Sequence, residues 1–394
     1  MSRVVAVGTA LPARRHLQSE ISDVIAPLLT RDRVRGMLAH RLHEHAGVES
    51  RHLALPLDEY AGLSTFGAAN DLFLTAATDL AAEAARRALA EAGLAPRDVD
   101  HVVVTSVTGI GAPSVDVLLA ERIGLRADVR RTPSFGWGCA GGAAGLARTD
   151  DLLRGRPRDV ALLVAVELCS LTLQHGDDST ANLAASGLFG DGAAAVVLVG
   201  DEHALARPRL PGGTRGTVGG AHRTARVVDS RSTLHPGTTG DLGWRVGDTG
   251  FEVVLSARLP ELVGAHLLGD VKALLAEHDL APAEVPTWVV HAGGPRILDA
   301  VRDALDLDEQ DLRHSRASLR EVGNLSSASV LHVLDATLAS STAPPGSAAV
   351  LVAFGPGVST ELVLLRLDGP PRNGPVRARV AGSAPAALPV EVGR

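Results

Sequence analysis

Apolar and polar residues along the first half of the chain follow the periods of helices and strands. Residues 71–92 are rich in Ala and Leu and are followed by Gly93, which predicts a helix ended by a glycine cap. The runs 160–166 and 193–199 are continuously apolar between Gly and charged residues, as expected for strands buried on both faces. This half also contains the predicted strand 101–106 and the predicted helices 115–123 and 140–154.

The second half repeats this alternation. Its predicted elements are, in chain order, helix 260–277, strand 287–291, helices 297–305 and 325–338, and strands 348–354 and 360–367. Because helices and strands alternate throughout, the fold class is predicted to be α/β, with helices covering sheets. Residues 201–223, rich in Gly, Pro and Arg, predict a loop, and residues 369–394, rich in Pro, Ala and Gly, predict a disordered tail.

The two halves also share a repeated sequence pattern. Residues 89–104 and 275–290 align without a gap, from a Leu-Ala-Glu triplet through Leu-Ala-Pro to a Val-Val pair. The surroundings of Cys139 recur at Asn324, and the second repeated strand runs straight into His291. A duplicated chain thus places a thiol, an imidazole and a carboxamide at the ends of equivalent elements, as expected when two halves build one site.

On this basis the chain divides into an N-terminal half, 1–223, a C-terminal half, 224–368, and the tail, 369–394. The first half carries the cysteine, and the second carries the histidine and the asparagine. No low-complexity linker separates the halves, so we expect them to pack as one body.

Composition narrows the class of protein. With 394 residues, 45% of them hydrophobic and 21% charged, the chain can bury a large core. A formal net charge of -7 and the lack of basic clusters interleaved with aromatic residues argue against a nucleic-acid partner. The N-terminus reads as a short apolar strand without a signal-peptide core, and no later run has the length of about 18 apolar residues that a membrane span needs. A cytoplasmic protein with no membrane association is expected.

The two cysteines, Cys139 and Cys169, are too few for a disulfide framework and lack the paired spacing of a zinc site, so both thiols are expected to be reduced. Cys139 lies at a predicted helix N-terminus, where the helix dipole and a nearby imidazolium can lower a thiol pKa below about 8.5. The glycines around it permit a sharp turn that aims the sulfur into a cavity. Taken alone, Cys139 and His291 could each have a structural role instead of a catalytic one, and Asn324 could be a helix N-cap.

Five segments together carry a family resemblance: 138–142 (GCAGG), 188–194 (LFGDGAA), 291–295 (HAGGP), 323–328 (GNLSSA) and 354–357 (FGPG). Each motif alone is weak, but in this order they resemble those of a type III polyketide synthase, in the chalcone-synthase-like branch of the thiolase superfamily. The likeness extends from Val4 to about Leu367. Residues 70–74 and 164–172 look most like those of bacterial alkylpyrone-type synthases.

The resemblance implies a thiolase fold, a duplicated α/β fold of five αβαβα layers, in a homodimer whose subunits each hold a complete site. It implies an acyl-CoA starter, malonyl-CoA or methylmalonyl-CoA as extender, and neither cofactor nor metal. Cys139 would take the starter acyl group, while His291 holds the thiolate. His291 and Asn324 would then donate hydrogen bonds to the malonyl thioester carbonyl, so that loss of the carboxylate leaves an enolate that attacks the acylated Cys139.

The resemblance also assigns the surroundings of the site. Phe189 and Phe251 match gatekeeping phenylalanines between a CoA tunnel and a cavity, although both could be core residues. Residues expected to line the cavity are Val107, Trp137, Cys169, Thr172, Leu242, Ser326, Gly355, Pro356 and Gly357. Arg41 is the candidate for contact with a CoA phosphate, and His45 stands where a lysine is usual. A medium or long acyl starter, cyclised to an alkylpyrone or resorcinol, is the expected chemistry.

Three alternatives use the same residue types. A β-ketoacyl carrier-protein synthase III shares the fold and the Cys, His and Asn set, but its histidine motif usually reads HQAN, and the loop 354–357 is foreign to it. A papain-like protease has the same chain order but would need different cysteine surroundings, disulfides and a secretory signal. A non-catalytic interaction protein with a thiolase fold is disfavoured because all three catalytic positions are intact.

Overall fold

The computed structural model describes residues 1–206 and 223–369. Within them, nine strands form one mixed sheet in the order β11-β12-β13-β8-β1-β7-β6-β4-β5. These strands are β1 (Ser2–Ala10), β4 (His101–Thr105), β5 (Arg130–Ser134), β6 (Val160–Leu168), β7 (Asp191–Gly200), β8 (Thr224–Leu234), β11 (Trp288–Val290), β12 (Ala348–Gly355) and β13 (Ser359–Asp368). Most of the predicted loop 201–223, and the predicted tail after Gly369, lie outside the described residues.

The strand pairing of the first half is repeated in the second. β4 and β6 are parallel, β6 and β7 antiparallel, and β7 and β1 antiparallel. In the same pattern, β11 and β12 are parallel, and both β12–β13 and β13–β8 are antiparallel. The two sets join only where residues 2–4 of β1 pair with residues 225–227 of β8. The duplication predicted from the sequence is therefore present in the topology.

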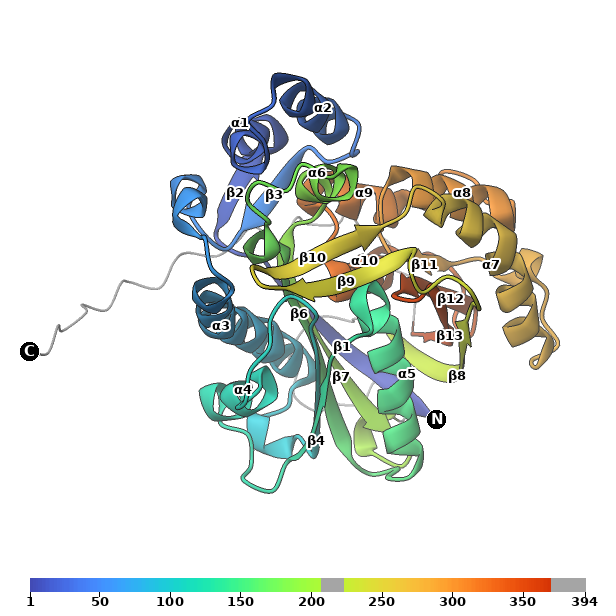
Figure 1. Cartoon of the computed structure of the whole chain (residues 1–394). Helices are drawn as coiled ribbons and strands as arrows, with labels where there is room; N and C mark the ends of the chain where they lie inside the picture. Colours follow the sequence, from blue (N-terminus) through green and yellow to red (C-terminus); the bar gives the residue numbers. More distant parts are fainter. Residues whose placement is uncertain (207–222, 370–394) are drawn as a thin grey trace, which may run out of the picture.

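Alternate residues of the strands face different cores, which sorts the molecule into layers. Val102 and Val104 of β4 face an outer core that contains α3 (Phe66–Ala92), whereas Val103 faces a central core. That central core holds α5 (Gly141–Arg154) and α10 (Ser329–Ser340) between the two sets of strands. On the far side, β12 packs against α7 (Leu259–Ala276) and α8 (Pro295–Leu305). Figure 1 shows α3 and α7 on opposite sides of this arrangement, so the predicted five-layered α/β fold is confirmed.

The predicted strands and most predicted helices agree with the structure within a few residues. The helix predicted over 71–92 begins at Phe66, because the hydroxyl of Thr65 accepts a hydrogen bond from the backbone N–H of Ala68. It ends as predicted, with Gly93 in the left-handed conformation at φ 70°. The helices predicted at 140 and 325 each open instead with a short 3-10 turn, Gly138–Ala140 and Ser326–Ala328.

Several elements had no sequence prediction. They are the helices α1 (Gln18–Leu29), α2 (Arg33–Glu44), α6 (Thr180–Leu188) and α9 (Arg313–Val322), and the strands β5 and β8 of the large sheet. The antiparallel pair of β2 (Arg14–Leu17) with β3 (Ser50–Leu53), and the hairpin of β9 (Leu242–Gly247) with β10 (Gly250–Leu255), were also not predicted. The chain also contains α4 (Val115–Ile123), as predicted. The β9–β10 hairpin crosses in front of the central helices in Figure 1.

Candidate active site

Cys139 lies in the 3-10 turn that leads directly into the central helix α5. Gly138 has φ 52°, a conformation that L side chains rarely adopt. A Cβ atom at Gly138 would stand 2.6 Å from Cδ of Pro356, so the loop 355–357 is packed directly against the cysteine turn. The glycine is therefore required both for the turn and for the close approach of that loop.

Asn324 occupies the equivalent position in the second half. It follows Gly323, which has φ 74°, and precedes the 3-10 turn that leads into α10. The side-chain oxygen of Asn324 accepts hydrogen bonds from the backbone N–H of Ser326 at 2.8 Å and from the hydroxyl of Ser329 at 3.4 Å. Its amide nitrogen donates to the carbonyl of Gly293 at 3.2 Å. These contacts fix which end of the carboxamide is the donor.

His291 follows β11, and its backbone N–H donates to the carbonyl of Val352 at 2.9 Å. The side chain is 2% exposed, and burial lowers the pKa of His291 to about 4, so the resting imidazole is neutral. Among the described residues, its Nδ1 atom has no hydrogen-bond partner. The carbonyl of Gly293 accepts the amide of Asn324, and a Cβ atom at Gly293 would stand 3.1 Å from Cδ2 of His291, so both side chains lie against this glycine.

The thiol of Cys139 lies beside Ser326, with 3.7 Å between the sulfur and the hydroxyl oxygen. Although Cys139 keeps some exposed surface, the surrounding protein raises its pKa to about 12. Burial is the main cause, Glu167 raises the pKa further, and hydrogen bonds from Ser326 and Asn324 lower it. The sequence predicted a lowered thiol pKa from the helix terminus and an imidazolium. The prediction fails for the resting site because His291 is neutral and desolvation dominates.

Glu167 was not identified as a site residue from the sequence. Its buried carboxylate accepts hydrogen bonds from Ser106 at 3.1 Å, from the backbone N–H of Val107 at 3.1 Å, from Thr108 at 2.8 Å and from Ser327 at 2.5 Å. Burial raises the pKa of Glu167, and these hydrogen bonds oppose that shift. A signal was available, because Glu167 is a charged residue within the otherwise apolar run 160–168.

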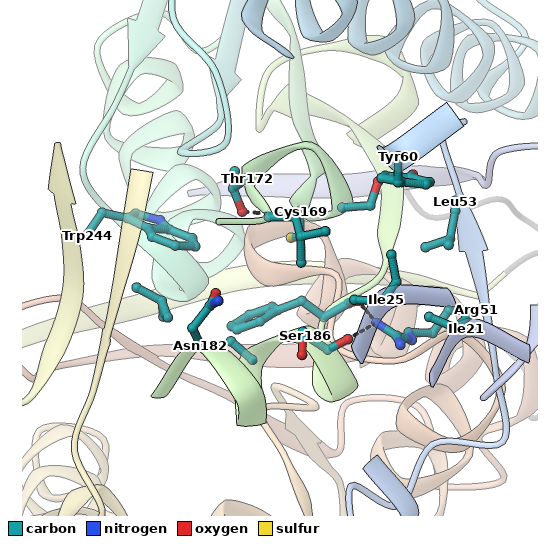
Figure 2. A pocket seen from close by; sticks show the side chains of 15 residues that line it. Ile21, Ile25, Arg51, Leu53, Tyr60, Cys169, Thr172, Asn182, Ser186 and Trp244 are labelled. Carbon is teal, nitrogen blue, oxygen red and sulfur yellow. Dashed lines mark hydrogen bonds between the residues drawn. The ribbon is translucent and has the colours of Figure 1, made fainter. Parts of the chain in front are cut away.

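A cavity of about 40 Å³ brings together three of the predicted residues, Cys169, Thr172 and Phe189. Trp244 of β9 closes one side, and Figure 2 shows Ile21, Ile25, Leu53 and Arg51 on the side opposite Trp244. A smaller space of about 10 Å³ lies between Thr172 and Phe251. Phe189, Cys169 and Thr172 therefore line one space, and their roles as gatekeeper and cavity residues stay predictions.

Phe251, the second predicted gatekeeper, is 2% exposed and lies within an aromatic cluster. Its ring centroid is 5.2 Å from that of Phe66 in an edge-on arrangement, 6.1 Å from that of Phe135 and 6.3 Å from that of Trp244. The chain has only ten aromatic residues in Phe, Trp and Tyr together, so four of them in one cluster is a strong concentration. No local sequence pattern indicates that Phe66, Phe135 and Trp244 gather there.

The remaining predicted residues fall into two groups. One group lies near the site: Val107, Ser326, Leu242, Trp137 and the loop 355–357. The backbone N–H of Val107 donates to Glu167, and the N–H of Gly357 donates to the carbonyl of Leu242 at 3.1 Å. A Cβ atom at Gly355 would stand 2.7 Å from the carbonyl oxygen of Trp137. Arg41, by contrast, lies on the exposed face of α2.

Within residues 1–206 and 223–369, no three His, Cys, Asp or Glu side chains are grouped so that they could hold a metal ion. None of the helices in these ranges has the length and apolar character needed to cross a membrane.

Comparison with known proteins places the whole described body in one family. Residues 1–202 match the N-terminal domain, and residues 226–367 the C-terminal domain, of chalcone and stilbene synthases. The chain is 50% identical over 363 residues to a 1,3,6,8-tetrahydroxynaphthalene synthase of Streptomyces peucetius subsp. caesius, with 92% of each chain covered. It is 34% identical over 327 residues to the synthase of that name in Streptomyces coelicolor, with 83% of this chain and 82% of the relative covered.

Two solved structures of polyketide synthases superpose on most of this chain. The crystal structure of 1,3,6,8-tetrahydroxynaphthalene synthase from Streptomyces coelicolor A3(2), described as a bacterial type III polyketide synthase, superposes with a TM-score of 0.82 at 31% identity, covering 93% of this chain and 99% of that one. A polyketide synthase from the brown alga Ectocarpus siliculosus superposes with a TM-score of 0.81 at 28% identity, covering 93% and 98%.

Proposed function

Since the chain belongs to the chalcone and stilbene synthase family, and is thus a type III polyketide synthase of the acyltransferase class, we propose that Cys139, His291 and Asn324 perform its condensation chemistry. The observation that supports this proposal is a series of contacts that connects the three residues through Ser326 and Gly293. Ser326 links Cys139 to Asn324, and Gly293 links Asn324 to His291.

Acylation begins with the thiol of Cys139 and the neutral imidazole of His291. In a buried site each charge alone is disfavoured, as the raised thiol pKa and the lowered imidazole pKa record. Transfer of the thiol proton to His291 forms both charges together, and each then stabilises the other. The thiolate attacks the thioester carbonyl of an acyl-CoA starter, a new S–C bond forms, and CoA leaves as its thiolate.

Extension depends on the amide of Asn324. One of its two N–H groups is engaged with Gly293, and the other lies toward the Cys139 sulfur, where the thioester oxygen of malonyl-CoA can accept it once that sulfur is acylated. As CO₂ leaves, negative charge develops on that oxygen, where Asn324 and His291 stabilise it. The enolate carbon then attacks the acyl group on Cys139, and the sulfur is released. Because its oxygen is held by Ser326 and Ser329, the Asn324 side chain needs no reorganisation during this step.

We further propose malonyl-CoA as the extender and a small polyhydroxylated aromatic compound as the product. The relatives are named for 1,3,6,8-tetrahydroxynaphthalene, whose ten ring carbons carry no alkyl chain, so five two-carbon units account for its skeleton. An alkylpyrone or resorcinol grown on a medium or long acyl starter stays a prediction.

The test is mass spectrometry of products formed from malonyl-CoA alone and with acyl-CoA starters from acetyl to palmitoyl, with Cys139→Ala as the control. We expect a naphthalene-type product from malonyl-CoA alone that is absent from the variant. Starter-dependent alkylpyrones would instead support the second product class. No product and no acyl adduct on Cys139 with any CoA thioester would overturn the proposal, and malonyl carrier protein would then be tried as donor.

The assembly is also proposed to be a homodimer with one complete site in each subunit. Every residue assigned to the chemistry comes from one chain, which supports independent sites. Sedimentation analysis of the purified protein tests the dimer.

A further inference from the structure

Arg51 of β3 is a buried cation beside the cavity. The side chain is 3% exposed, and Figure 2 shows it with Ser186 and Ile25 at one wall of the cavity. Its Nε donates to the side-chain oxygen of Gln18 at 3.0 Å. Its Nη1 donates to the carbonyl of Ser186 at 2.8 Å and to the carbonyl of Phe189 at 2.6 Å. The guanidinium is therefore directed at the backbone that carries the proposed gatekeeper.

Arg51 carries its positive charge in an unfavourable, buried position. Among the described residues it has no ion pair within 4.0 Å, and its Nη2 atom has no hydrogen-bond partner. Burial lowers the pKa of Arg51 to about 10, while the opposite charge of Asp191 acts in the other direction. A buried, incompletely paired charge is costly. The role of Arg51 therefore follows from the segments that its side chain contacts.

Arg51 contacts Phe189 and also Gly323, the residue before Asn324, at the place where Phe189 and Asn324 are joined. The two residues pair as an isolated parallel β-bridge. The backbone N–H of Asn324 donates to the carbonyl of Leu188, and the N–H of Gly190 donates to the carbonyl of Asn324, each at 2.9 Å. On one side of this bridge, the guanidinium of Arg51 holds the Phe189 carbonyl.

On the other side, the aliphatic part of Arg51 packs against Gly323. A Cβ atom at that glycine would stand 3.1 Å from both Cγ and Cδ of Arg51. Gly323 directly precedes Asn324 and takes the left-handed φ of 74° that begins the turn. One side chain therefore contacts the gatekeeper segment and the oxyanion-stabilising segment together.

Asp191 anchors the same segment from its other end. Its carboxylate accepts hydrogen bonds from the backbone N–H of Ala54 at 2.7 Å, and from the N–H and hydroxyl of Ser170 at 2.8 Å and 2.5 Å. Ala54 and Arg51 belong to the same stretch of chain, so this stretch holds residues 189 and 191 at once. The position of Phe189 is thereby fixed by a part of the chain that contributes nothing to the chemistry itself.

We propose that Arg51 is a positioning residue that keeps Phe189 and Asn324 in the geometry required for condensation. The proposal rests on the function proposed above. Without Arg51, Phe189 no longer closes the site tightly and the amide of Asn324 is displaced. The enolate formed by decarboxylation then takes a proton from water and leaves as acetyl-CoA, instead of forming a C–C bond with the acyl group on Cys139.

The experiment compares Arg51→Met and Arg51→Lys with a matched control, Arg223→Met. Arg223 is also 3% exposed and also donates to backbone carbonyls, those of Ser341, Ala343 and Pro344, but these follow α10 and lie outside the site. For each folded variant, acetyl-CoA and polyketide released from malonyl-CoA are quantified, together with kcat and KM. Circular dichroism and thermal unfolding establish that each variant is folded.

For Arg51→Met we expect the ratio of acetyl-CoA to polyketide to rise about tenfold or more and kcat for condensation to fall by up to about 10²-fold, the effect of a displacement of about 1 Å. Arg51→Lys, which keeps the charge and one donor, should be intermediate. Arg223→Met should lose stability but keep the wild-type ratio. Equal ratios in Arg51→Met and Arg223→Met would overturn the proposal, whereas an inactive wild type would overturn the proposed function instead.

Discussion

The sulfur of Cys139 lies 3.7 Å from the hydroxyl oxygen of Ser326, within hydrogen-bond range for a thiol. This contact lowers a thiol pKa that burial otherwise raises to about 12. Replacing Ser326 by Ala should raise the Cys139 pKa further and move the pH profile of alkylation by iodoacetamide to higher pH. The measurement is the rate of carbamidomethylation of Cys139 between pH 7 and pH 10 by peptide mass spectrometry.

Cys169 is the internal reference for that measurement. It is also buried, and its thiol pKa is raised well above the usual value, with no contribution from Ser326. Its alkylation rate should be the same in the wild type and in Ser326→Ala. A Cys139 profile that the substitution leaves unmoved would show that Ser326 has no part in activating the thiol.

Gly138 should tolerate no side chain. In Gly138→Ala the new Cβ meets Pro356 in addition to the left-handed strain of about 1–2 kcal/mol. Gly93 is the matched control, since it has φ 70° but nothing within 4 Å of a Cβ atom. We expect Gly138→Ala to lose more unfolding free energy than Gly93→Ala, and to lose most condensation activity while Gly93→Ala keeps it. Urea unfolding and the product assay measure both, and equal losses would contradict the close-approach argument.

Trp244 should limit the length of the starter, because it closes one side of the cavity that contains Phe189 and Cys169. Trp244→Ala opens this space to longer acyl chains. Each methylene that becomes buried contributes about 0.8 kcal/mol, or about fourfold in kcat/KM. We therefore expect the ratio of hexanoyl-CoA to acetyl-CoA utilisation to rise at least about fourfold. Val246→Ala is the control, since Val246 lies on the same strand and is 62% exposed.

His43 should make the protein sensitive to acid. Burial is the main cause that lowers its pKa from 6.5 to about 4, and its two ring nitrogens contact the hydroxyls of Ser22 and Ser186. Between these pH values the unfolded chain binds a proton that the folded protein does not, so stability is lost as the pH falls. From pH 7 to pH 5 the loss attributable to His43 is about 2 kcal/mol.

Urea unfolding at pH 7 and pH 5 checks this expectation. His43→Gln should lose less stability between the two pH values than the wild type, since glutamine can keep a polar contact but does not titrate. His45→Gln, at an exposed position on the surface, should behave like the wild type. An identical pH dependence in the wild type and in His43→Gln would contradict the assignment.

The elements that could be predicted from the sequence are those whose pattern reports burial directly. β6 and β7 are buried along their whole length, and their apolar runs were visible. α2 is largely polar, which hides its helical period, whereas α1 was missed although Ile21, Ile25 and Leu29 recur at helical spacing, because Pro27 within it argues against a helix. The positions of Cys139, His291 and Asn324 at the ends of repeated elements could be predicted because the repeat and the motifs mark them locally.

The rest of the site depends on contacts between distant parts of the chain. Arg51 reaches Ser186 across 135 residues, and Trp244 meets Phe251 only because a hairpin folds there. The pKa of the Cys139 thiol also depends on distant parts of the chain. A helix terminus is a local feature that the sequence reveals, but desolvation is produced by the whole surrounding protein, and here it is the larger effect.

The equivalent turns at Cys139 and Asn324 also explain why a fused pair of halves is needed. Each turn follows a glycine with positive φ and opens a helix of the central layer. Two separate, identical chains arranged about a twofold axis would present the same side chain at both places, either two thiols or two amides. Joining the copies in one polypeptide frees each position to mutate without changing its twin. A thiol and a carboxamide can then face the same site from symmetry-related backbones.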